Sequence, residues 1–390
     1  MMTKNNESVD ENTPKTVELK RKRKQPVFQF SANPVYDLLL SLHVAFCPAR
    51  KDDYDLDRNW IDAALNKCPD TLKEDLFYYF GEDEGQWCAA KLTGIFWQAD
   101  TQSIPATLDW FEQNASITDI IETLLESDGI GTDWQIQANE LILRSLEYAA
   151  KPNTSEKNKQ SLAKQISVFS KRFPAAERAG IVAMISNPEQ TRNNIAAILR
   201  EWYRLVFAEE EPRLRAQLEK EVNRLKMLNQ EVSHEQLFGS VIRGFIYDPP
   251  AAVERIVLVP SIMLSPAIFH MRVNDTLTYC YPLTVENLEN LNEEDSQRHE
   301  LAALFDALSD DTRLRILRLL AQRSMYLTEL AEHLGLTKAT TRHHMIRLRA
   351  AGVVTLLMRE HYSYYFLRKD MLDSPSKLLR MFLQITETEQ

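Results

Sequence analysis

The chain contains little of what turn-rich or disulfide-bonded folds require. Only 10 of its 390 residues are glycine, which disfavours many tight β-turns and favours a mainly α-helical fold. No two cysteines form a C-x-x-C pair, so neither a zinc knuckle nor a dithiol redox site is indicated; the four are Cys47, Cys68, Cys88 and Cys280. Scattered thiols in a long chain fit a reducing cytoplasm better than secretion.

Long apolar runs and catalytic motifs are also absent from the sequence. No stretch of about 18 apolar residues occurs, and the polar first residues do not resemble a signal peptide. We therefore expect a cytoplasmic protein with no membrane partner. The chain has no G-x-S-x-G, P-loop, G-x-G-x-x-G or H-E-x-x-H pattern. We accordingly expect no catalytic residue, no enzymatic activity, no cofactor and no metal.

The first two segments of the chain differ sharply in composition. Residues 1–26 are polar, carry the basic run Lys20–Lys24 and predict a disordered tail. The basic run is a solvated tail, a phosphate-contacting arm or a localisation signal. Residues 27–245 have apolar side chains at helical spacing and predict a helical domain, a candidate for effector or partner binding. Its aromatic cluster, residues 77–80, is either core or the wall of a ligand pocket.

The spacing and type of the apolar residues change after residue 245. Residues 246–296 contain two β-branched runs, Arg255–Pro260 and Leu277–Tyr281, and predict a small β-rich element followed by a linker. Residues 297–390 return to helical spacing and predict a separate C-terminal domain.

Four helices are expected at the start of this domain. An apolar stripe of Leu301, Leu304, Phe305 and Leu308 predicts the first, and Asp310 or Asp311 is placed to cap the second. The third runs from about Leu327 to Leu334 and ends at Gly335. Thr337 then caps the fourth, residues 338–351. Two helices joined by so short a turn form a helix-turn-helix.

The fourth helix is expected to have two distinct faces. Thr341, His344, Met345 and Leu348 share one face, which we expect to pack on the third helix. The opposite face begins at the helix N-terminus, the end that enters the DNA major groove in this motif. Lysine and arginine there can donate to guanine, and free N-terminal amides can meet a phosphate. Adjacent histidines, His343 and His344, point to different faces and are therefore poor ligands for one metal ion.

A β-wing is predicted after this helix, with strands at residues 353–359 and 362–367. Although the chain carries a net charge of −10, residues 338–369 contain only one acid, Glu360. The strip holds the basic residues Lys338, Arg342, Arg347, Arg349, Arg359, Arg368 and Lys369. Such a strip is the electrostatic footprint that DNA binding needs. Arg347 and Arg349 are either phosphate contacts or solvated charges, and the tyrosines at 362, 364 and 365 either pack the wing or stack on bases.

These motifs together resemble the ArsR-type winged helix-turn-helix regulators. The resemblance is carried by D-x-T-R-L-x-I-L from Asp310, L-A-x-x-L-G-L from Leu330 and H-H-[ML]-x-x-L-x-x-A-G-x-V from His343. It covers about a quarter of the chain. The stretch from Asn33 to Leu42 is similar, more weakly, to the helical N-terminal region of larger ArsR-like regulators.

The chain departs from the family in two places that bear on function. Metal sensors of the family carry a C-x-C motif on the third helix, whereas this domain has no cysteine, so thiolate sensing is not expected. The wing tip has His361-Tyr362 where a glycine and a second arginine are usual. A minor-groove arginine contact is therefore not expected there.

The resemblance implies a homodimer that regulates transcription, with repression as the family default. The first and last helices of the domain would form the interface, through Leu301, Leu304, Phe305, Leu378, Met381 and Phe382. A palindromic site on double-stranded DNA would be read by helix 338–351. The expected DNA-binding residues are Lys338, Ala339, Thr340, Arg342, His343, Arg347, Arg359, His361 and Tyr362. A small-molecule effector would act through the N-terminal region. The alternative is a winged-helix scaffold that binds protein and not DNA.

Overall fold

A four-stranded sheet joins the two ends of the N-terminal part of the molecule. The computed structural model describes residues 25–46, 53–55, 58–80, 89–125, 134–151, 153–175, 177–283, 293–359, 362–371 and 374–384. The strands are β1 (Val27–Phe30), β2 (Arg255–Ser261), β3 (Phe269–Val273) and β4 (Thr276–Pro282), in the order β1-β2-β4-β3. β1, β2 and β4 are parallel, and β3 is antiparallel to β4. Segments 27–245 and 246–296 thus share one sheet.

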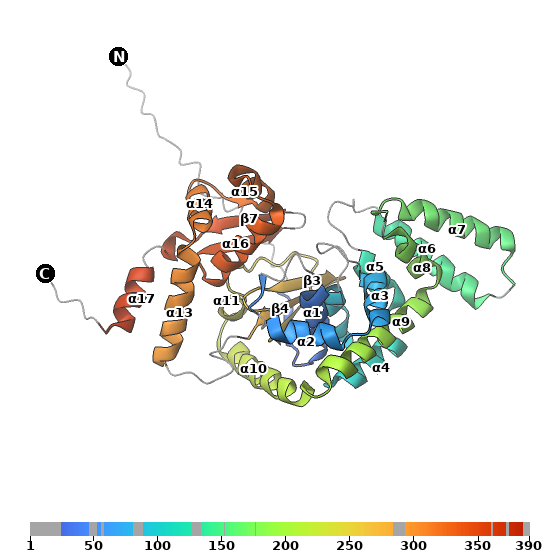
Figure 1. The fold of residues 1–390 in the computed structure, drawn as a ribbon, viewed down its shortest axis with the longest axis horizontal. Coiled ribbons are helices and arrows are strands. Elements are labelled where there is room, and N and C mark those ends of the chain that lie inside the picture. Colours follow the sequence, from blue (N-terminus) through green and yellow to red (C-terminus); the bar gives the residue numbers. More distant parts are fainter. Residues whose placement is uncertain are drawn as a thin grey trace, which may run out of the picture.

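Helices surround this sheet and extend away from it to form a lobe at one end of the molecule (Figure 1). Serines cap several of them: the Ser103 hydroxyl accepts from the Ala106 N–H at the start of α4, and Ser233 forms a capping box with Gln236. The helices are α1 (Val35–Phe46), α2 (Arg58–Lys67), α3 (Asp70–Phe80), α4 (Ile104–Asn114), α5 (Ile117–Leu125), α6 (Trp134–Ala150), α7 (Glu156–Ser170), α8 (Arg178–Ser186), α9 (Pro188–Trp202), α10 (Glu211–Glu231) and α11 (His234–Val241), with short 3-10 turns η2 (Ala89–Gly94) and η3 (Phe96–Gln98) and a π-helical turn η4 (Tyr203–Phe207).

The two faces of the sheet belong to different hydrophobic cores. Side chains alternate between faces along a strand, so neighbours on β2 enter opposite layers. Val257 and Val259 join the core of the helical lobe, which α1 and η2 cover. Ile256 and Leu258 face a second core that also holds Leu225 of α10. Because β2 is buried on both faces, its sequence is a continuous apolar run without alternation.

The second core continues into the C-terminal domain. That domain contains α13 (Glu293–Leu308), α14 (Asp311–Leu320), α15 (Leu327–Leu334), α16 (Lys338–Ala350), η5 (Lys369–Met371) and α17 (Ser374–Phe382), and a sheet of β5 (Met325–Tyr326), β6 (Val354–Arg359) and β7 (Tyr362–Leu367) in the order β5-β7-β6. Ile316, Met345 and Leu348 pack in the same cluster as the sheet residues of the N-terminal part. The mainly α fold and the C-terminal winged helix-turn-helix are therefore confirmed.

A short segment between α11 and β2, residues 244–246, binds the edge of the wing. The Leu356 N–H donates to the Gly244 carbonyl at 2.8 Å, and the Ile246 N–H donates to the Leu356 carbonyl at 3.0 Å. Phe245 and Leu356 form an isolated parallel bridge beside β6. Gly244 has φ +75°, a left-handed conformation, and a Cβ there would overlap the Arg349 side chain. Only glycine fits this approach without strain.

We expect Gly244→Ala to destabilise the protein by about 1–3 kcal/mol, because alanine is strained at this φ and would push against Arg349. Urea unfolding measures the change. Gly239→Ala is the matched control, since a Cβ at Gly239 meets no atom within 4 Å and alanine favours the helix. Equal unfolding midpoints for the two variants would contradict the packing described for Gly244.

Candidate nucleic-acid interface

The turn between α15 and α16 is set by three residues. Gly335 ends α15 in the left-handed conformation, φ +69°, which glycine adopts without strain. The Thr337 hydroxyl accepts from the Thr340 N–H at 3.1 Å and so caps α16. The Thr341 hydroxyl donates to the Thr337 carbonyl at 2.9 Å. The local sequence thus fixes where α16 begins.

One face of α16 packs inside the C-terminal domain. Thr341, Met345 and Leu348 are buried, and α16 contacts α13, α14 and α15. His344 is half-buried with its Nδ1 3.5 Å from Asp310 Oδ1. Burial lowers the pKa of His344, and the Asp310 carboxylate opposes that effect. This face therefore holds the helix on its own domain.

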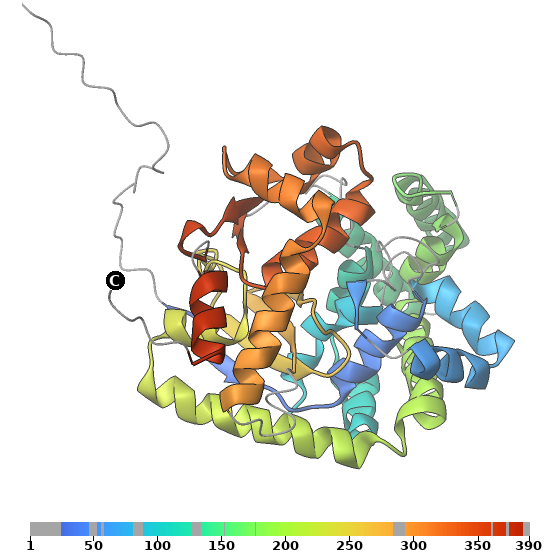
Figure 2. The same ribbon diagram turned by 60° about the vertical axis from the view of Figure 1, so that its left-hand side comes forward.

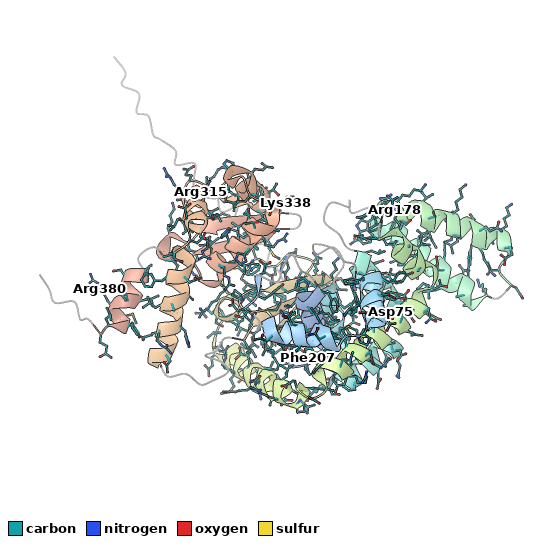
Figure 3. All side chains as sticks on the ribbon, in the orientation of Figure 1. Asp75, Arg178, Phe207, Arg315, Lys338 and Arg380 are labelled. Carbon is teal, nitrogen blue, oxygen red and sulfur yellow. The ribbon has the colours of Figure 1, made fainter. Side chains whose placement is uncertain are left out.

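The first turn of α16 is open on the opposite side. Lys338 and Thr340 are exposed, whereas Ala339 and Arg342 are half-buried. Figure 3 shows Lys338 on the part of the C-terminal domain that is remote from Arg380 of α17. The helix N-terminus thus presents a positive side chain and a hydroxyl to solvent.

The later turns of the same outward face contact the N-terminal part. His343 Nδ1 lies 3.2 Å from Asp53 Oδ1, and Arg347 Nη1 lies 2.7 Å from Asp55 Oδ1. Ile346 is buried in the core built by the N-terminal helices. Figure 1 shows α16 on the side of its domain that faces β3. Sequence reasoning missed Asp53 and Asp55, because no local pattern links residues this far apart.

Arg349 differs from the rest of the basic strip. It is buried, and its guanidinium lies 4.3 Å from the centre of the Phe245 ring, a cation–π distance. Burial lowers the pKa of Arg349. In this structure Arg349 is neither a solvated charge nor open to a phosphate, although the sequence suggested one or the other.

The wing pairs β6 with β7 up to Arg359 and Tyr362, which are opposite each other in the register. Nothing further is described for these two side chains, and His361 lies outside the described residues. The Tyr364 ring packs against the Tyr326 ring in a tilted arrangement, with ring centres 4.1 Å apart, and their hydroxyls are hydrogen-bonded. With Tyr365 buried, the tyrosines at 364 and 365 serve wing packing.

The residues expected at a dimer interface fall into two groups. Leu301 and Leu304 are buried within one copy of the chain, and Leu378 and Phe382 are half-buried. Other side chains on the same helices remain open: Phe305 is 45% exposed and Met381 is 50% exposed. α13 and α17 contact each other and lie side by side in Figure 2. Each of these two neighbouring helices thus leaves an apolar side chain exposed.

Neither a metal-binding cluster nor a membrane-spanning helix is found among the described residues. Within these ranges, no three His, Cys, Asp or Glu side chains are grouped closely enough to hold a metal ion. In the same part of the chain, no helix combines the length and apolar character needed to cross a bilayer.

His270 of β3 is packed where the C-terminal domain meets the sheet. Its ring lies 6.0 Å from Phe245 and 5.8 Å from Tyr279. Burial, aided by the Arg349 guanidinium, lowers the pKa of His270 from 6.5 to about 4. Between these pH values the unfolded chain binds a proton that the folded chain does not, so stability falls as the pH falls.

We expect His270→Phe, which keeps an aromatic ring and removes the titration, to reduce the loss of stability between pH 6.5 and pH 4. The reduction should be roughly 1–3 kcal/mol, allowing for the partial exposure of the ring. Urea unfolding across this pH range measures it. His333→Gln, at an exposed position of α15, is the control. An unaltered pH dependence in His270→Phe would show that His270 does not cause it.

Comparison with known proteins gives matches to the C-terminal part. Residues 310–355 match the model of the arsR family of bacterial regulatory proteins. An uncharacterized HTH-type transcriptional regulator of Methanocaldococcus jannaschii is 33% identical over 85 residues, which is 96% of that protein and 21% of this chain. The transcriptional repressor SdpR of Bacillus subtilis is 31% identical over 80 residues, 89% of that protein and 20% of this chain.

Proposed function

The chain belongs to the arsR family of bacterial regulatory proteins through its C-terminal domain, and from that membership we propose that it is a dimeric repressor that reads a palindromic DNA site with α16. One observation carries the proposal. The outward face of α16 is basic, has no acidic residue and begins at an exposed, capped N-terminus behind a helix-turn-helix turn.

The side chains of this face have the chemistry that reads a major groove. Lys338 and Arg342 can donate to guanine O6 and N7, and the Thr340 hydroxyl can donate to or accept from a base edge or a phosphate. The free amides of the first turn favour a phosphate oxygen. We propose that Arg347, on a later turn of α16, contacts the backbone of the duplex. Arg359, His361 and Tyr362 of the wing remain proposed contacts, together with Ala339 and His343.

Dimerisation is proposed through the outer surface of α13 and α17. Phe305 on α13, Met381 on α17 and Leu383 directly after α17 are large apolar side chains that are exposed to solvent, and burying such side chains favours association. To read two half-sites one turn of DNA apart, a twofold dimer formed through these surfaces would need its two copies of α16 about 34–36 Å apart. The symmetry of the protein would then set the symmetry of the site.

The N-terminal part is proposed as the regulatory region. An effector or partner that prefers one arrangement of the two domains would change DNA affinity, and DNA would change effector affinity by the same factor.

A second function, protein binding by the winged helix without DNA, has one observation in its favour. His343, Ile346 and Arg347 already contact a protein surface, that of the N-terminal part.

We expect Arg342→Ala to weaken binding to a DNA site selected in vitro by about 1–3 kcal/mol, because the guanidinium can make a bidentate contact to guanine. Fluorescence anisotropy with the full-length protein measures the change. Arg315→Ala removes the same charge from the exposed side of α14 and should change affinity little. Equal losses on the selected site and on random DNA would assign Arg342 to a phosphate. No loss on either duplex would favour the protein-binding function.

We expect the double variant Phe305→Glu/Met381→Glu to be monomeric, because like charges would replace apolar contacts across the proposed twofold interface. Analytical ultracentrifugation measures the mass. Ile136→Glu/Leu143→Glu on α6 is the control, since both side chains are exposed apolar residues far from this surface in the sequence. A dimer that survives in the first variant would place the interface elsewhere.

A further inference from the structure

The side of α16 that lies opposite its own core is occupied by the N-terminal part of the same chain. With 3.6 residues per turn, Ala339, His343 and Ile346 lie along the middle of this side. Ile346 is only 9% exposed and belongs to the core of the N-terminal helices. An isoleucine on the surface that reads DNA is therefore shielded from water by the protein itself.

Two carboxylates face the basic side chains of α16 at this contact. Asp53 is 5% exposed and accepts from His343 at 3.2 Å, and Asp55 lies 2.7 Å from the Arg347 guanidinium. α16 contains no acidic residue. Each contact therefore pairs a carboxylate of the N-terminal part with a basic side chain of α16. The carboxylates occupy positions where DNA would offer phosphate oxygens or base acceptors.

The segment that carries these acids is firmly attached. Tyr54 is buried, and its hydroxyl is 3.0 Å from His43 Nε2 on α1. The Asp55 N–H donates to the Ser265 carbonyl at 2.6 Å, just beyond β2. Asp53 and Asp55 are thus held by α1 and by the loop after a central strand. A shift of α1 against the sheet would move both acids.

The same stretch of α16 is held from its other side. Phe245 lies under the Arg349 guanidinium, and Gly244 approaches the Arg349 side chain closely. The Leu356 N–H donates to the Gly244 carbonyl and the Ile246 N–H donates to the Leu356 carbonyl, and these two bonds fix the segment on the wing. The later turns of α16 therefore lie between two parts of the N-terminal region.

We propose that this docking is autoinhibitory: Asp53, Asp55 and the surface around Ile346 block the DNA-reading face of α16 until the two domains separate. The inference rests on the proposed function. To read DNA, α16 has to enter a major groove that is about 8.5 Å deep. The helix cannot enter the groove while the N-terminal part covers its outward face. The two carboxylates would also repel the phosphates of an approaching duplex. The exposed first turn leaves only Lys338 and Thr340 available.

The test compares the full-length protein with Asp53→Asn/Asp55→Asn. In this proposal, only molecules whose two domains are separated bind DNA. The apparent Kd therefore equals the intrinsic Kd divided by the fraction of molecules in that separated form. Removing both contacts should tighten binding to a random-sequence duplex at low salt by about 5- to 150-fold, the usual range of coupling between sites. Asp62→Asn/Asp75→Asn is the matched control: both acids are exposed on α2 and α3, and the net charge changes equally. It should alter affinity by no more than about twofold.

Hydrogen exchange of the α16 amides without DNA provides a second measurement. Exchange across residues 343–350 should be faster in Asp53→Asn/Asp55→Asn than in wild type, and unchanged in the control. If wild type binds the duplex as tightly as the variant does, autoinhibition is wrong while DNA binding stands. If neither wild type nor either double variant binds any duplex at low salt, the proposed DNA-binding function is wrong, and autoinhibition of that function is wrong with it. Thermal unfolding of each variant establishes that it is folded.

Discussion

The outward face of α16 can contact only one surface at a time. Its inner face is committed to the C-terminal domain by Thr341, Met345 and Leu348, which are buried. The remaining side is shared between two possible neighbours, a DNA duplex and the surface that carries Asp53 and Asp55. This exclusion couples the N-terminal region to DNA binding without any change in the shape of the helix. Regulation by this route needs only a change in how the domains are docked.

The relatives show that the helix-turn-helix motif does not depend on an N-terminal region of this kind. Those from M. jannaschii and B. subtilis align over 96% and 89% of their own length with the C-terminal part of this chain. A helix-turn-helix of this family therefore exists with hardly any additional sequence. The N-terminal helices and sheet are not required by the motif, and what they add here is a second surface for α16 and for the wing edge.

Local signals in the sequence were enough to predict the secondary structure of the C-terminal domain. Gly335 and Thr337 place the turn before α16 because each favours one backbone conformation or one cap, whatever surrounds it. Periodicity likewise predicted the inner face of α16. The pairing of β1 with β2 was not predictable in this way, since parallel partners far apart in sequence leave no short-range pattern. Within α16, Ile346 is the residue that points to contact with another part of the chain. An apolar side chain on a DNA-reading face would otherwise be exposed to water.

The bridge between Phe245 and Leu356 has a consequence for the separated form. β6 is the outer strand of the wing sheet, and the segment at 244–246 satisfies backbone groups on its free edge. Once the domains part, those groups become an open template that a strand from any other chain can extend. The active regulator would then be the more aggregation-prone form, and cells would benefit from keeping it scarce or bound to its operator.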